Sequence, residues 1–101
     1  MTNTATKPFD AAEYLETEQD IKEFLRQAAE DGNTQHLVHC LGVAVRSKGM
    51  SEVATNVGVT RASLYKSFAE GANPKLDTIN KVLGVLGCKL SVTADNSQSH
   101  A

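Results

Sequence analysis

Long apolar runs are missing from this chain of 101 residues, and no stretch approaches the ~20 apolar residues that a membrane span needs. Cysteine is scarce: Cys40 and Cys88 alone cannot build a disulfide scaffold, and they suit a reducing cytoplasm. Three phenylalanines and two tyrosines are too few for a platform that stacks single-stranded nucleic acid. Seven glycines and two prolines exclude the collagenous and disordered classes. The remaining class is a soluble globular domain, which we expect in the cytoplasm because residues 1–8 lack the apolar stretch of a secretory signal.

The charges divide between the two halves of the chain. Residues 1–45 hold three basic and eight acidic side chains, a net charge of −5, whereas residues 46–90 hold seven basic and three acidic ones, a net charge of +4. This asymmetry suggests that the basic half meets a polyanion and the acidic half a basic protein, although ordinary solvated charges would give the same pattern.

Apolar periodicity predicts five helices. A capping box at 17–20 opens the first helix, which ends at residues 31–33, and Asn33 or Thr34 caps the second, which ends at Gly49. The expected starts and stops of the others are Ser51 and Gly58 for the third, Thr60 and Phe68 for the fourth, and Asn73-Pro74 and Gly87 for the fifth. We expect Val59 and Leu76 to belong to the buried apolar set.

Residues 88–93 alternate between apolar and polar side chains, with Cys88, Leu90 and Val92 on one side, which predicts a short β-strand. Because the chain offers no partner strand, we expect it to pair with the same strand of a second copy across a two-fold axis. The chain is thus predicted to have an arm over 1–8, one domain over 9–93 and a disordered tail over 94–101.

Residues 50–68 match a helix-turn-helix. Ala54 is small where the two helices would cross, Gly58 tolerates a left-handed turn, and Thr60 can open the second helix. In such motifs the second helix enters the major groove of DNA by its N-terminal end. We therefore expect a five-helix, all-α, DNA-binding domain.

The candidate DNA-binding residues lie on the second helix of this motif and at the start of the first. They are Ser51, Thr60, Arg61, Ser63 and Lys66. Arg61 suits a bidentate contact to guanine, whereas Lys66 suits a phosphate, which positions the protein without reading sequence. Tyr65 is compatible with either a phosphate contact or partial packing.

Several segments together carry a family resemblance. They are 9–15 (FDAAEYL), 17–25, 49–54 (GMSEVA), 58–66 (GVTRASLYK), Asn73-Pro74 and 82–87 (VLGVLG) with the strand that follows. In them the chain resembles the addiction-module antidote family, HigA-like antitoxins with a Cro/cI-type (Xre-type) helix-turn-helix. The resemblance implies a small all-α homodimer that neutralises a RelE/HigB-type toxin, usually an mRNA-cleaving ribonuclease, and represses its own operon. The chain departs from the family at Glu52, where Gln is common, and at Ala62, where a polar residue is frequent.

Other groups of residues give weaker evidence of function than the helix-turn-helix does. His36, His39 and Cys40 share one helix but lack a fourth zinc ligand unless Cys88 or a second subunit contributes, so we expect no metal and no cofactor. The sequence has no Walker loop, no GxGxxG motif and no other cluster suited to turnover, so we also expect no enzymatic activity. The acidic side chains between Asp10 and Glu23 suit a basic toxin, or form a solvated helix face. Two alternative functions stay open: a stand-alone phage- or plasmid-type repressor, and a toxin-binding or dimerisation module whose helix-turn-helix no longer binds DNA.

Overall fold

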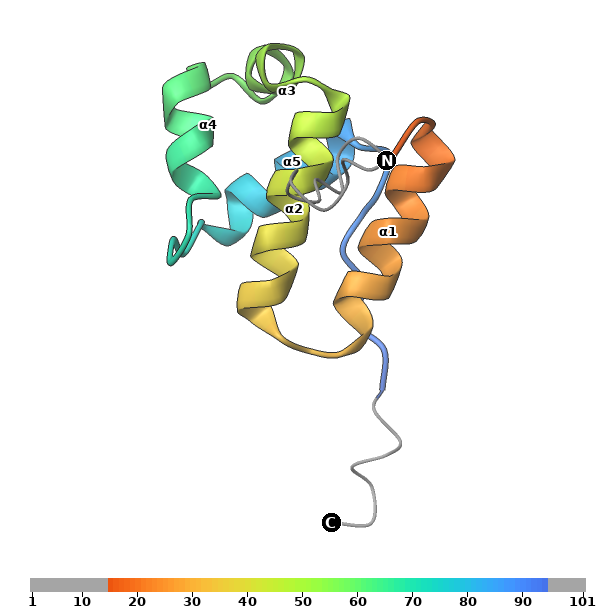
Figure 1. The fold of residues 1–101 in the computed structure, drawn as a ribbon. Helices are drawn as coiled ribbons and strands as arrows, with labels where there is room; N and C mark the ends of the chain where they lie inside the picture. Colours follow the sequence, from red (N-terminus) through yellow and green to blue (C-terminus); the bar gives the residue numbers. More distant parts are fainter. Residues whose placement is uncertain (1–14, 95–101) are drawn as a thin grey trace, which may run out of the picture.

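Five α-helices make up the described part of the chain, which is residues 15–94 of the computed structural model (Figure 1). They are α1 (Glu18–Glu30), α2 (Thr34–Lys48), α3 (Met50–Val57), α4 (Arg61–Ser67) and α5 (Leu76–Val85). The all-helical prediction is confirmed for this region. No β-strand occurs within residues 15–94, and the segment expected to be one lacks regular secondary structure. The expected arm over 1–8 lies outside the described residues, as does the expected tail apart from Ala94.

The first two helices form an antiparallel pair (Figure 1). The capping box predicted for α1 is present: Thr17 Oγ1 accepts a hydrogen bond from the Asp20 amide at 3.0 Å, and the Asp20 carboxylate accepts one from the Thr17 amide at 3.2 Å. Asn33, not Thr34, caps α2, because its Oδ1 accepts from the His36 amide at 3.0 Å. Side-chain caps thus fix the N-terminal end of each of the two helices.

The hydrophobic core is centred on α2 and receives at least one fully buried side chain from each of α3, α4 and α5. The side chains with no exposed surface are Leu41, Ala44, Val45, Val53, Leu64 and Val82. Burying a side chain of the size of Leu or Val contributes about 1.5–3 kcal/mol. Leu64 is the only fully buried residue of α4, so this one side chain anchors the helix in the core.

A left-handed turn joins α3 to α4, as the sequence predicts. Gly58 has φ +89° and ψ +31°, and its amide donates to the Ala54 carbonyl at 2.9 Å. Thr60 then caps α4 by accepting from the Ser63 amide at 3.0 Å. Ala54 is 4% exposed where the two helices meet. The turn therefore directs α4 away from α3 with its N-terminal end at the surface (Figure 1).

Two predicted helix starts are wrong. Gly49 ends α2 and also precedes the first residue of α3, so Ser51 lies inside the first turn and is not the cap. The fifth helix begins at Leu76, after Lys75 in an extended conformation (ψ 150°), and not at Pro74. The fixed φ of proline suits an extended segment as well as a helix start, so Pro74 does not by itself locate the helix.

Two residues expected in the core lie at the surface instead. Leu76 is 68% exposed because it is the first residue of α5 and precedes the part of the helix that packs on the core. Val59 is 38% exposed because it belongs to the turn between Gly58 and the cap of α4.

Gly58 and Gly84 give a matched test of the turn. Alanine at Gly58 must adopt a left-handed backbone, and we expect it to lower the free energy of unfolding by about 1–2 kcal/mol. Alanine at Gly84, inside α5, is expected to raise that free energy by about 0.5–1 kcal/mol because glycine is a poor helix former. An added Cβ would have no neighbour within 4 Å at either site, so packing does not confuse the comparison. Urea unfolding measures both, and equal effects would refute the left-handed turn.

Candidate nucleic-acid interface

The candidate DNA-binding residues at the start of α4 and along it lie together at the surface. Thr60, Arg61, Ser63 and Lys66 are all exposed, whereas Leu64 faces the core. Since α4 has seven residues, about two turns, one buried leucine leaves the opposite face free. The helix therefore presents a polar surface with two cationic side chains, as the sequence predicts.

Arg61 and Tyr65 form a contact on this face. The guanidinium carbon of Arg61 lies 5.7 Å from the centroid of the Tyr65 ring, within the range of a cation–π interaction. Tyr65 is 48% exposed. The ring lies beside the Arg61 guanidinium at the first turn of α4, and both roles left open for Tyr65 stay predictions.

Ser51 and Glu52 lie exposed in the first turn of α3. The Glu52 carboxylate lies 3.7 Å from Lys48 Nζ, and the same ammonium lies 3.4 Å from the Glu18 carboxylate. Lys48 thus joins the start of α1, the end of α2 and the start of α3, and it offsets part of the negative charge of Glu52. The sequence did not reveal this role, because Glu18 and Lys48 are 30 residues apart.

A second surface feature is the segment after α5. The Cys88 amide donates to the Leu83 carbonyl at 2.8 Å, and from there the chain runs alongside α1 (Figure 1). Cys88 is half-buried against the core, whereas Leu90 is 44% and Val92 100% exposed. No backbone hydrogen bond joins residues 89–94 to another described residue. The three side chains expected on one strand face therefore differ in exposure.

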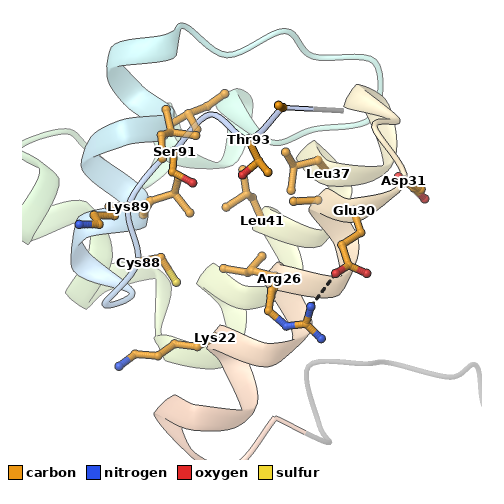
Figure 2. A pocket seen from close by; sticks show the side chains of 16 residues that line it. Lys22, Arg26, Glu30, Asp31, Leu37, Leu41, Cys88, Lys89, Ser91 and Thr93 are labelled. Carbon is orange, nitrogen blue, oxygen red and sulfur yellow. Dashed lines mark hydrogen bonds and ion pairs between the residues drawn. The ribbon is translucent and has the colours of Figure 1, made fainter. Parts of the chain in front are cut away.

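A groove of about 970 Å³ lies between this segment, α1, α2 and α5. Figure 2 shows Leu37 and Leu41 of α2 on one side of it and Cys88, Lys89 and Ser91 on the other. Charged side chains of α1 rim the groove, among them the ion pair between Arg26 and Glu30 at 2.6 Å (Figure 2). The groove is thus apolar at its base and charged at its edge.

The acidic side chains of α1 are largely engaged within the chain. Glu23 and Glu30 both bind Arg26 at 2.6 Å, and the hydrogen bond from Arg26 lowers the pKa of Glu23 to about 2. Asp20 belongs to the capping box and Glu18 pairs with Lys48. Two further members of the acidic stretch, Asp10 and Glu13, lie outside the described residues. Three of the four described members of the stretch, Glu18, Asp20 and Glu23, thus have partners within the chain.

Among residues 15–94, the cysteines and histidines show no feature of a reactive site. Cys40 Sγ lies 3.6 Å from His36 Nε2, and burial raises the pKa of the Cys40 thiol. Burial also raises the pKa of the Cys88 thiol, so both stay protonated at neutral pH. Within residues 15–94, no three side chains of the His, Cys, Asp and Glu types are grouped as a metal ion would need.

Comparison with known proteins gives two matches. A family model described as "probable addiction module antidote protein" matches residues 5–94. An uncharacterized protein of Haemophilus influenzae is 33% identical over 86 residues, which cover 85% of this chain and 89% of the relative. No solved structure matches. None of the helices within residues 15–94 has the length and apolar character required to cross a bilayer.

Proposed function

The chain belongs to the family of probable addiction module antidote proteins, and we propose that it is an antitoxin that both binds its toxin and represses its own operon. The toxin is a RelE/HigB-like protein, held by direct contact in the cytoplasm. The DNA is the operator upstream of the module. This chain performs no catalytic step and needs no cofactor. Binding alone accounts for both activities.

The exposed face of α4 carries the DNA-binding part of the proposal. The N-terminal end of α4 enters the major groove, where Arg61 contacts a guanine and Thr60 and Ser63 contact base edges or adjacent phosphates. Lys66 contacts a phosphate, and Ser51 contacts the backbone from the first turn of α3. The buried Leu64 and the Gly58 turn support this assignment because they hold the helix in place while leaving its polar face free.

The charge of Glu52 does not prevent this docking. Lys48 lies 3.7 Å from the Glu52 carboxylate and reduces the repulsion that a phosphate would meet there. Ala62 is exposed on α4 and contributes no hydrogen bond, so sequence readout depends on its neighbours. The combination favours modest sequence discrimination that centres on Arg61.

We assign the segment 88–94 to the contact between two copies of the chain. Its backbone groups beyond Cys88 have no described partner, and Leu90 and Val92 expose apolar surface. Antiparallel pairing of the two segments across a two-fold axis satisfies those groups and covers those side chains. The symmetric dimer then presents two copies of α4 to half-sites about one helical turn (~34 Å) apart.

Two measurements on the full chain test the function. Co-expression with the neighbouring reading frame is expected to relieve the growth arrest that its product causes, and the two proteins are expected to co-purify. Affinity for the upstream DNA is expected to fall steeply with salt, with a log–log slope of about −0.9 per phosphate contacted. Arg61→Ala is the matched control, since it weakens operator binding while leaving toxin neutralisation intact.

The outcomes separate the alternatives. DNA binding without any toxin in the neighbouring frame favours a stand-alone repressor. Toxin neutralisation without salt-dependent DNA binding favours an interaction module whose α4 is inactive. Either result overturns half of the proposal and leaves the other half standing.

A further inference from the structure

The groove between α1, α2, α5 and the segment 88–94 has an apolar lining that is partly accessible. Leu37 of α2 and Ile79 of α5 are half-buried where they line it, and Leu90 of the segment is 44% exposed. The segment itself forms one wall, and its backbone beyond Cys88 makes no backbone hydrogen bond to another described residue. Accessible apolar side chains beside an unpaired backbone are the features that allow a further strand to be added.

The charges around this groove have opposite signs at its two ends. Lys22 lies at the start of the segment, because a Cβ added at Gly87 would be 2.8 Å from Lys22 Cε. Figure 2 shows Lys89 at the same end and Glu30 and Asp31 at the other, beside the last residues of the segment. The segment therefore runs in the same direction as α1, from a positive end of the groove to a negative one.

Three of these charges are available to a partner. Within residues 15–94, neither Lys22 nor Lys89 forms an ion pair, and the Asp31 carboxylate accepts one hydrogen bond, from the Asn33 amide at 3.0 Å. A two-fold axis across the groove reverses the direction of the second copy, so the positive end of each copy meets the negative end of the other. The groove is therefore complementary in charge to a second copy of this chain.

We propose that the groove of each copy holds residues 89–94 of the other copy, antiparallel to its own segment, and that Lys89 of one copy pairs with Asp31 of the other. The inserted segment exchanges backbone hydrogen bonds with the segment that already forms the wall. The inference rests on the dimer of the proposed function. It adds where the second copy lies and which charges set the direction of pairing.

The alternation of the segment suits this insertion. Val92 is fully exposed and does not line the groove of its own copy, so its side chain is free to enter the groove of the other. There Leu90 and Val92 cover the accessible surfaces of Leu37 and Ile79. Because successive side chains of a strand point to opposite faces, Lys89 then faces the charged rim and not the apolar base.

Charge reversal in the full chain, without DNA or toxin, tests the ion pair. Lys89→Glu and Asp31→Lys are each expected to weaken dimerisation about tenfold in sedimentation equilibrium, because the two-fold axis repeats a pair that contributes up to about fivefold. The double variant exchanges the two charges and is expected to dimerise within about threefold of the wild type. A double variant that dimerises more weakly than both single variants overturns the pairing.

Two controls accompany these variants. Lys75→Glu reverses an exposed cation outside the groove and is expected to leave dimerisation unchanged, and an effect equal to that of Lys89→Glu overturns the assignment to Lys89. A cation at the C-terminal end of α1 suits the helix dipole, so Asp31→Lys is expected to stay folded, which urea unfolding checks.

Isotope-filtered NMR of a mixture of labelled and unlabelled wild-type chain locates the segment. We expect intermolecular NOEs from the methyl groups of Leu90 and Val92 to those of Leu37 and Ile79. Intermolecular NOEs between the two segments without any to Leu37 or Ile79 overturn insertion into the groove and leave the dimer of the proposed function standing. A wild-type chain that is monomeric overturns both. Neither measurement depends on whether the chain binds DNA or a toxin.

Discussion

An operator affinity lower by about a hundredfold or more is the expected result of replacing Val92 with aspartate. When two α4 helices are held in one dimer, binding of the second half-site is intramolecular, and such linkage raises affinity by roughly 10²–10⁴. Val92 is fully exposed, so the substitution removes no packing within one chain. In an antiparallel pairing across a two-fold axis, two aspartates at this position repel each other near the symmetry axis. Sedimentation equilibrium and DNA binding at a fixed salt concentration measure the two linked effects.

Leu76→Asp is the matched control for this prediction. Leu76 is also an exposed apolar residue, 68% exposed, and the change in charge is the same, but it lies at the start of α5 outside the pairing segment. We expect Leu76→Asp to remain dimeric and Val92→Asp to become monomeric, with unfolding free energies of the monomers within about 0.5 kcal/mol of each other. Dissociation by Leu76→Asp alone would move the interface to α5 and refute pairing through residues 88–94.

The features that the sequence predicted well are those with a local cause. Three such features are the Thr17 capping box, the Gly58 turn and the Thr60 cap. Each depends on residues within four positions of one another, so it can be predicted without knowledge of the tertiary fold. The exposure of Arg61 and Lys66 was predictable for a similar reason. Leu64 occupies the buried side of a two-turn helix, and the polar residues around it face outward.

The errors occurred where local signals are ambiguous. Proline at position 74 is compatible with a helix and with an extended chain. Because Lys75 is extended, α5 begins only at Leu76. The strand over 88–93 is not one of these errors and stays a prediction, because it is expected to pair with a second copy and the single chain provides no hydrogen-bonded neighbour for it among residues 15–94. Alternation of apolar and polar residues therefore predicts that a segment can form a strand, but it does not predict which strand it pairs with.

Charge interactions across the fold were the least accessible to sequence reasoning. Lys48 meets Glu18 and Glu52 only because the two ends of the α1–α2 pair come together with the start of α3. In the proposed DNA complex, this contact matters because it partly neutralises the Glu52 carboxylate, which the sequence alone marked as unfavourable for DNA binding.

Arg61→Ala and Lys66→Gln are expected to weaken DNA binding in different ways. Loss of Arg61 removes a bidentate base contact and should cost about 1–3 kcal/mol of binding free energy at one base pair. The Arg61→Ala chain should then bind the operator and an operator changed at that base pair with equal affinity. Loss of Lys66 removes a phosphate contact and should weaken all sequences alike, while the slope of log affinity against log salt falls by about 1 per contact. Salt titrations on the operator and on single-base variants measure both.

Tyr65→Phe and Tyr65→Ala show whether the ring beside Arg61 contributes to that readout. The Arg61 guanidinium lies 5.7 Å from the ring centroid, so phenylalanine preserves the contact and should keep discrimination at the Arg61 base pair. Alanine frees the guanidinium and should reduce that discrimination about two- to fivefold, the range for an exposed cation–π contact. If Arg61→Ala and Lys66→Gln lower affinity for every sequence by the same factor, Arg61 contacts the backbone and not a base, and sequence specificity must then come from the shape of the DNA.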